Sequence, residues 1–118
     1  MTLTPARIDI IAAFYGKHPT DIDRVISRIK TFYDEIKTIE LYFLKDHDIN
    51  IVLEDDAIDF ILAQFVNLGI DFSQVYKQLA TNFELGLKLV REKTGRKRFF
   101  LSRDALMSPE RQISSLLK

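Results

Sequence analysis

Residues Asp71 to Gly95, which read DFSQVYKQLATNFELGLKLVREKTG, carry the clearest structural signal in the chain. They have the marks of a helix with both ends defined. The Asp71 carboxylate can accept hydrogen bonds from the free N–H groups of the first turn, and Gln74 can complete a capping box. Gly95 can adopt the left-handed conformation that ends a helix. Arg91 and Lys93 place positive charge in the last turn, where the helix dipole favours it.

The apolar residues of this helix recur in steps of three or four and form one stripe, which consists of Phe72, Tyr76, Leu79, Phe83, Leu87 and Val90. Gly86 lies on the same stripe, although glycine costs about 1 kcal/mol of helix propensity relative to alanine. We therefore expect a neighbouring backbone to pack closely at Gly86. The helix is predicted to be the central element of the core.

The composition of the chain excludes several classes of protein. At 118 residues the chain has the size of one domain, and its 17 basic residues balance 17 acidic ones, so net charge indicates no polyanionic partner. The absence of cysteine excludes disulfides and thiolate chemistry. No apolar run approaches the roughly 18 residues of a membrane span, and no signal-peptide core is present. We expect a cytoplasmic protein without a membrane partner.

Two helices are predicted at the start of the chain. The first has Thr4 as its cap and Pro5 at its first position, and its expected apolar face is Ile8, Ile11, Ala12 and Tyr15. After a turn at residues 18–20, Thr20 is the expected cap of a second helix of about six turns. Its pattern breaks at residues 47–48.

Two short strands are predicted further along. Residues 49–53, INIVL, alternate and are rich in β-branched side chains, with Ile49, Ile51 and Leu53 on one face. Residues 98–102, RFFLS, are the second candidate strand. Because an isolated strand is not stable, the two are expected to pair, in a direction that the pattern does not decide.

A helix with the acidic start Glu54-Asp55-Asp56 follows the first strand and ends near Gly69, and its expected buried face is Ala57, Ile58, Ile61, Leu62, Phe65 and Val66. This helix and the long helix of residues 71–95 lie between the strands, so both are expected to cover one face of the sheet. Ser108 and Pro109 begin a last helix.

The predicted fold class is therefore α+β, mainly α, with about five helices and a small two-stranded sheet. The chain is expected to be a single domain over residues 1–118. Residues 1–48 form a helical lead-in, and residues 49–118 form a strand–helix–long helix–strand–helix core.

The sequence contains no motif for phosphate or metal chemistry. Neither the glycine-rich phosphate loop nor the dinucleotide fingerprint is present. His18 and His47 lie beside predicted helix ends, but a metal site needs at least three converging ligands, so they are interpreted as solvated turn residues. The acids of residues 54–56 point about 100° apart on a helix, so helix capping is the better interpretation. We expect no catalytic residue, no metal and no enzymatic activity of this chain alone.

Residues 91–98, REKTGRKR, hold five basic side chains, which are Arg91, Lys93, Arg96, Lys97 and Arg98. One interpretation is a helix C-terminus followed by a solvated turn. The other is a contact patch for a protein neighbour or for a phosphate backbone. Nucleic acid is not the expected partner, because only Phe99 or Phe100 is available there as a stacking platform.

Residues 49–61, INIVLEDDAIDFI, read as a strand followed by an acid-capped helix, and a short break at 68–70 leads into the long helix and a second strand. In this order the segment from about Tyr42 onward resembles the small C-terminal (lid) domain of AAA+ ATPases, nearest the Clp-type (ClpX-like) protein unfoldases. The helices over residues 5–43 are similar to the lead-in from the large ATPase domain of that family.

This resemblance implies a lid that closes over a nucleotide held by the large domain, packs on the next subunit of a ring and moves as a rigid body. ATP and Mg²⁺ are then cofactors of the parent protein, and this chain holds none. The nucleotide-contacting turn of the family maps onto Gly69, Asp71 and Gln74. Asp71 stands where the family has its second-sensor arginine, and because a carboxylate repels phosphate, that role is not carried over.

The leading hypothesis is the C-terminal lid and subunit-contact domain of an AAA+ ATPase, a possible ATP-dependent chaperone or unfoldase. Its expected partners are the large ATPase domain of the same protein and the neighbouring subunit, contacted through residues 69–74 and 91–98. The alternative is a stand-alone helical adaptor that binds a protein through an exposed apolar groove, and a weaker one is a nucleic-acid-binding helical domain. Walker motifs upstream in the reading frame would favour the lid.

Overall fold

The computed structural model describes residues 1–17, 19 and 21–118. The elements in order are α1 (Pro5–Lys17), α2 (Ile22–His47), β1 (Asn50–Leu53), α3 (Asp55–Leu68), α4 (Phe72–Thr94), β2 (Arg98–Leu101), α5 (Arg103–Met107) and α6 (Pro109–Leu117). The predicted class, α+β and mainly α, is confirmed, with six helices in the described ranges. The short helix α5 was not predicted. No described helix is both long and apolar enough to cross a membrane.

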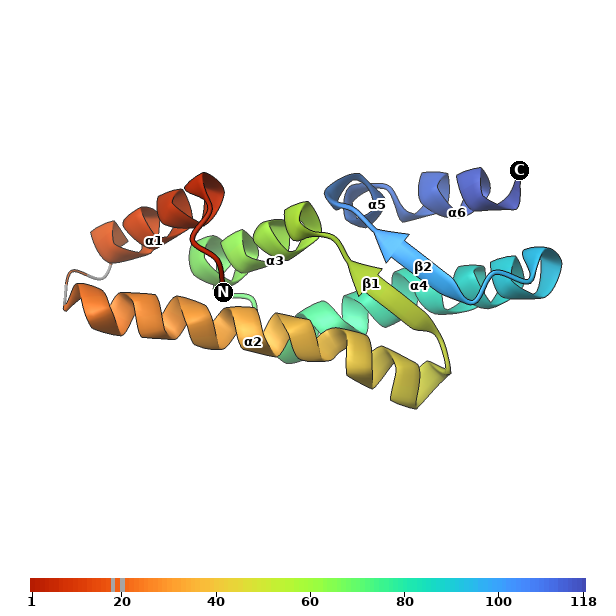
Figure 1. Ribbon diagram of the computed structural model, residues 1–118, viewed down its shortest axis with the longest axis horizontal. Helices are drawn as coiled ribbons and strands as arrows, with labels where there is room; N and C mark the ends of the chain where they lie inside the picture. Colours follow the sequence, from red (N-terminus) through yellow and green to blue (C-terminus); the bar gives the residue numbers. More distant parts are fainter. Residues whose placement is uncertain (18, 20) are drawn as a thin grey trace.

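The two strands pair in parallel, a direction that the sequence left open (Figure 1). Ile51 lies opposite Phe99 and Leu53 lies opposite Leu101, and all four side chains are buried. Phe100, between the two buried residues of β2, lies on the exposed face. Parallel strands cannot be joined by a tight turn, so α3 and α4 together form the connection between them.

The outer edge of β1 is covered by α2. Glu40 Oε2 accepts a hydrogen bond from the backbone N–H of Leu53 at 2.8 Å, and Glu40 Oε1 pairs with Lys37 Nζ at 3.0 Å. Ile36 and Ile39, on the same stretch of α2, are fully buried. The 26-residue helix α2 therefore packs against β1 and also satisfies a backbone donor at its edge.

All six predicted apolar residues of α3 are buried. However, α3 leads away from the sheet and packs against α1, α2 and α5, whereas α4 passes behind both strands (Figure 1). The expectation that both connecting helices cover the sheet is therefore wrong for α3.

The acidic residues at the start of α3 bond to neighbouring helices and do not cap α3 through their side chains. Glu54, at the cap position, makes no side-chain cap bond. Asp55 Oδ1 pairs with Arg7 Nη2 at 3.4 Å, and Asp56 Oδ1 accepts the backbone N–H of Arg103 at 3.1 Å. The interpretation of these residues as caps is thus corrected: Asp55 and Asp56 tie α1 and α5 to α3, while their charge still suits the positive end of the helix.

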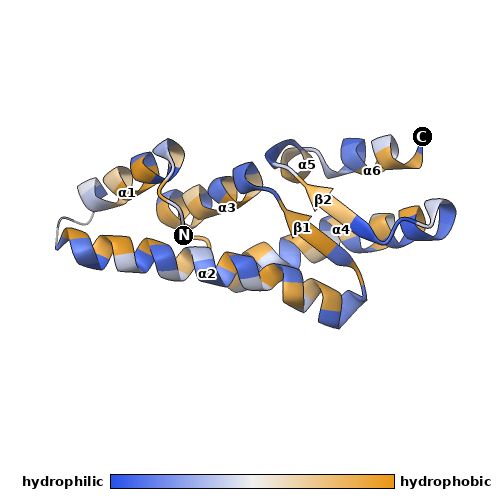
Figure 2. Ribbon diagram, in the orientation of Figure 1, coloured by the Kyte–Doolittle hydropathy of each residue, from blue (hydrophilic) through white to orange (hydrophobic). Residues whose placement is uncertain are grey.

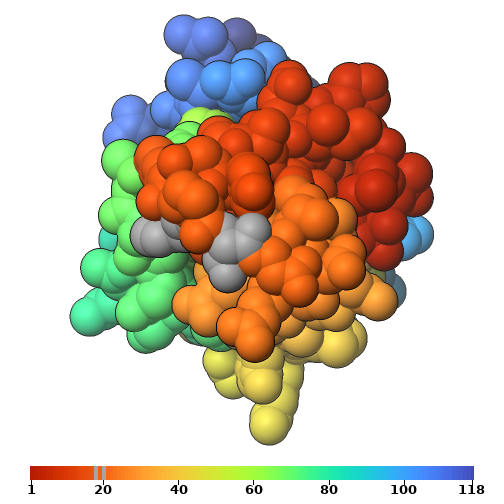
Figure 3. All heavy atoms as spheres, turned by 90° about the vertical axis from the view of Figure 1, so that its left-hand side faces the viewer, coloured from red at the N-terminus to blue at the C-terminus, as the bar shows by residue number. Residues whose placement is uncertain are grey.

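Of the predicted apolar face of α1, Ile11 is buried as expected and the other three residues are exposed. Ile8 and Tyr15, expected inside, are 51% and 40% exposed, and Ala12 is also exposed. The inward face consists of Arg7, Ile10, Ile11 and Phe14. Figure 3 shows this end of the molecule, where α1 (red to orange-red) lies across α2 (orange) beside α3 (green).

Arg7 is the reason for this rotation, because its guanidinium is buried and multiply bonded. Nε donates to Asp59 Oδ1 at 2.8 Å, Nη1 donates to the carbonyl oxygen of Thr2 at 2.9 Å, and the group lies 4.9 Å from the centre of the Tyr33 ring. Burial lowers the pKa of Arg7, but the hydrogen bond and charge of Asp59, with the charges of Tyr33 and Asp55, leave it above its ordinary value. A polar residue thus fixes the orientation of an otherwise apolar face.

The caps of the longer helices follow the sequence closely, with one exception. Asp71 Oδ1 accepts the N–H of Gln74 and Gln74 Oε1 accepts the N–H of Asp71, both at 2.9 Å, which is the predicted capping box. Gly95 ends α4 with φ of 72°. Thr20, the expected cap of α2, lies outside the described residues, and Asp21 caps that helix through its side chain.

Of the predicted stripe on α4, four residues are buried, and Phe72 and Tyr76 are half-buried. The close neighbour at Gly86 is a side chain, where a backbone was expected. A Cβ atom added there would lie 2.2 Å from Cδ1 and 2.9 Å from Cγ1 of Ile113. Ile113 therefore packs α6 onto α4 directly over Gly86, and a side chain at this position would require Ile113 to shift.

Replacing Gly86 tests this contact. Gly86→Ala is expected to lower the free energy of unfolding by about 1 kcal/mol, because overpacking against Ile113 exceeds the gain in helix propensity. In an Ile113→Ala background the same change should raise the free energy of unfolding by up to about 1 kcal/mol. Urea denaturation of the four chains measures both effects, and equal effects in the two backgrounds would contradict the close approach.

Arg7→Met should lower the free energy of unfolding by about 2 kcal/mol, because it removes charged hydrogen bonds and leaves Asp59 without its cation. The matched control is Arg24→Met on the exposed surface of α2, which should cost less than about 0.5 kcal/mol. Both are measured by urea denaturation. If the two substitutions cost the same, Arg7 does not hold α1.

Candidate functional site

The turn between α3 and α4 contains the three residues predicted to contact a nucleotide. Gly69 ends α3 with φ of 65°. Asp71 and Gln74 each direct a side-chain oxygen to the other's backbone N–H. The turn is therefore a helix junction whose polar side chains are engaged locally and whose one charge is negative. A nucleotide contact at these residues stays a prediction.

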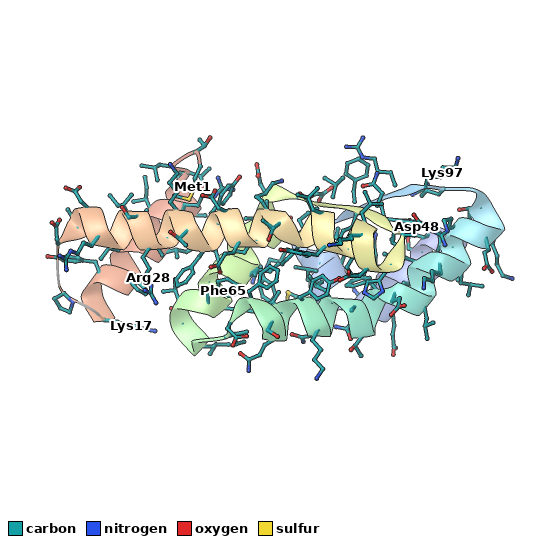
Figure 4. The ribbon with its side chains drawn as sticks, turned by 90° about the horizontal axis from the view of Figure 1, so that it is seen from below. Met1, Lys17, Arg28, Asp48, Phe65 and Lys97 are labelled. Carbon is teal, nitrogen blue, oxygen red and sulfur yellow. The ribbon has the colours of Figure 1, made fainter. Side chains whose placement is uncertain are left out.

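This turn forms one wall of a groove of about 530 Å³ between α1, α2 and α3. Figure 4 shows Arg28 and Phe65 directed into this part of the molecule. The Arg28 guanidinium lies 5.5 Å from the centre of the Phe32 ring, and Phe32 packs edge-on against Phe65 at 5.4 Å. The lining residues are Phe14, Arg28, Phe32, Glu35, Phe65, Val66, Gly69, Ile70, Asp71 and Phe72.

Sequence reasoning did not connect Arg28 with the turn, because the two lie far apart in the chain. Within the described residues that line the groove, Arg28 is the one cation, and Glu35 and Asp71 are the acids. An arginine on an aromatic ring beside two carboxylates can hold a mixed apolar and polar ligand in place. Nothing in this set forms a nucleophile with a base.

The five predicted contact residues gather at the opposite end of the molecule, where α2 and α4 both end (Figures 1 and 4). Arg91 donates to the carbonyl oxygen of Asp48, the residue with φ of 55° that ends α2, and Arg98 lies 5.4 Å from the centre of the Phe100 ring. The segment between α4 and β2 is strongly hydrophilic in Figure 2, in contrast to the strands themselves.

The side chains of the other three basic residues, Lys93, Arg96 and Lys97, are exposed and have no hydrogen bond or ion pair within residues 1–17, 19 and 21–118. The structure therefore separates the basic segment into two parts. Arg91 serves the fold by holding the end of α2, and the remaining residues present positive charge to solvent.

Besides the α3–α4 turn and the basic segment, a cluster of polar side chains lies between α2 and α4. The Tyr76 hydroxyl donates to Asp46 Oδ2 at 2.7 Å, and His47 Nδ1 lies 3.2 Å from Glu84 Oε1, which also accepts from Lys88 Nζ at 3.1 Å. The hydrogen bond from Lys88, with the charge and hydrogen bond of His47, keeps the pKa of Glu84 below its ordinary value. These contacts join α2 to α4 through side chains of both helices.

The sequence offers His18 and His47 as candidate metal ligands, and no metal site is expected at either. His18 lies outside the described residues. The interpretation of His47 as a solvated turn residue is wrong, because His47 is the last residue of α2, its side chain is 18% exposed and it pairs with Glu84. In the described ranges no group of three or more histidine or acidic side chains is arranged to bind a metal ion.

No protein-family model, no curated protein and no solved structure matches this chain.

Tyr76 provides a pH test of the contact between α2 and α4. Burial raises the pKa of Tyr76, and the hydrogen bond to Asp46 and the negative charges of Asp46 and Glu84 raise it further. The contribution of the Tyr76 hydroxyl to the free energy of unfolding is therefore fully present below about pH 10, the ordinary tyrosine pKa. It is lost as the pH rises above that value.

Tyr76→Phe is the comparison. At neutral pH the wild-type chain should be more stable to urea by about 1 kcal/mol, and this difference should shrink as the pH rises above about 10. A difference that stays constant up to about pH 11 would show that the hydroxyl is not held in the folded state as described.

Proposed function

We propose that this chain is the C-terminal lid and subunit-contact domain of an AAA+ ATPase, with a cytoplasmic ATP-dependent chaperone or unfoldase as its parent. The observation that supports this most is the path from α2 to β2. A long lead-in helix is followed by a strand, two helices joined by a short turn, and a second strand that pairs with the first. This is the order of elements on which the resemblance to the lid domain rests.

Mechanical coupling within the domain is the second support, because a lid moves as one body. α2 and α4 are joined by three polar links, which are Asp46–Tyr76, His47–Glu84 and Asp48–Arg91. Aromatic packing of Tyr42 against Phe72 at 5.9 Å and of Phe43 against Tyr76 at 6.2 Å fills the same interface. A force applied to the lead-in helix is therefore passed to the long helix without an intervening hinge.

In this role the chain hydrolyses no ATP. Nucleotide and Mg²⁺ are held by the large domain of the parent, and Asp71, whose carboxylate repels phosphate, does not take the place of the family's second-sensor arginine. The contribution of this domain is assembly, and its contact with the neighbouring subunit is made by Lys93, Arg96, Lys97 and Arg98.

The size of the native polypeptide is the decisive test. An antibody raised against this chain should detect, in cells that produce it, a polypeptide much larger than 13.7 kDa, and the isolated chain should show no ATP turnover with Mg²⁺. A native product of 13.7 kDa would contradict the lid and leave the adaptor. Turnover by the isolated chain would contradict both.

The adaptor remains the second candidate because the groove beside the α3–α4 turn is lined by aromatic side chains. Its occupant would be an apolar segment of a partner carrying a basic residue, since Glu35 and Asp71 place negative charge at the wall. Glu35→Lys, on the exposed wall of the groove, should then weaken binding to such a partner, whereas a lid that contacts its neighbour through the basic end would keep its assembly.

A further inference from the structure

The outer edge of β2 differs from the outer edge of β1. Leu101 accepts a hydrogen bond from the N–H of Glu54 through its carbonyl oxygen at 2.9 Å. In a parallel ladder every second residue of a strand bonds to its partner strand. Leu101 and Phe99 therefore turn their backbone groups toward β1, and Arg98 and Phe100 turn theirs outward.

The same alternation holds on β1, where Leu53 turns its N–H outward. That donor is covered, because Glu40 accepts from it at 2.8 Å. No corresponding partner reaches the backbone N–H or C=O of Arg98 or Phe100 within the described residues. One edge of this two-stranded sheet is closed by α2, and the other offers backbone donors and acceptors.

The side chains around the open edge have a definite character. Phe100 is 52% exposed, with the Arg98 guanidinium 5.4 Å from the centre of its ring. Arg96 and Lys97 precede the strand and are exposed. Short, positively charged edge strands resist pairing with copies of themselves. The charge that repels a second copy attracts an acidic chain.

We propose that the outer edge of β2 receives an extended acidic segment of a partner protein, which adds a third strand to the sheet through hydrogen bonds to Arg98 and Phe100. Acidic side chains of the segment lie near Arg96, Lys97 and Arg98, and an apolar side chain covers Phe100. This inference goes beyond the lid proposal and does not depend on it, because the edge is a property of the domain by itself. In a ring, the acidic segment would belong to the neighbouring subunit, which the lid proposal places at the same basic residues.

The test uses the full chain and a synthetic hexapeptide of three glutamates followed by three valines, blocked at both ends. In an NMR titration at low salt, the amide signals of Arg98 and Phe100 should shift saturably, and higher salt should weaken the binding. A hexapeptide with lysine in place of glutamate should not bind. Signals that move mainly outside β2 and its flanking residues would overturn the proposal.

Two comparisons separate strand addition from simple charge attraction. The same acidic peptide, N-methylated at every residue, keeps its charge but loses the backbone donors of both edges, and it should bind at least about tenfold more weakly. Equal binding of the two peptides would overturn the proposal. Self-association through β2 without any peptide would overturn it as well, in favour of a second copy as the occupant.

Among variants, Arg98→Glu should weaken binding of the acidic peptide about tenfold, because the charge beside the edge is reversed. Lys30→Glu makes the same change of charge on the exposed surface of α2 and should leave binding within about twofold. Circular dichroism establishes that both variants are folded. Equal weakening by both would mean that net charge, and not the edge of β2, determines binding.

Discussion

The parallel pairing of β1 with β2 is the constraint on which the structure depends. Two parallel strands need a long connection, and here that connection is the whole of α3 and α4. A two-stranded ribbon is also too small to be stable by itself. It persists because its inner face joins the buried cluster of α2 and α4 and because Glu40 closes one edge. The strands are therefore stable only when packed against α2 and α4. Their parallel pairing in turn requires α3 and α4 to lie between them in the chain.

Local signals made much of this fold predictable. Asp71, Gln74 and Gly95 define α4 through interactions within a few residues of each other, and the apolar periodicity of α3 identified its entire buried face. The strands were found from their alternation, but their direction depends on contacts between distant segments. Helix α5 was missed because a five-residue helix is too short to show periodicity. The face of α1 was missed because Arg7 is buried through partners on another helix.

The candidate sites show the same division. The turn residues Gly69, Asp71 and Gln74 lie where the sequence placed them, and their capping bonds follow from local geometry. The proximity of Arg28 to that turn, the pairing of His47 with Glu84 and the open edge beside Phe100 are tertiary facts, and the sequence carries no local trace of them. The basic residues of 91–98 were recognised as a group from the sequence. That Arg91 is structural and the others are exposed became clear only from its contact with Asp48 at the end of α2.

The apolar side chains of this domain are packed in its own core. Among the described residues, the groove beside the α3–α4 turn and the basic segment at the opposite end are the two regions available to partners. Native-state hydrogen exchange tests this account most directly. The slowest-exchanging amides of α2, α4 and both strands should open with one common free energy, equal to the global free energy of unfolding. Exchange of α2 through a separate opening of much lower free energy would contradict the claim that the strand pair and the two long helices form one rigid unit.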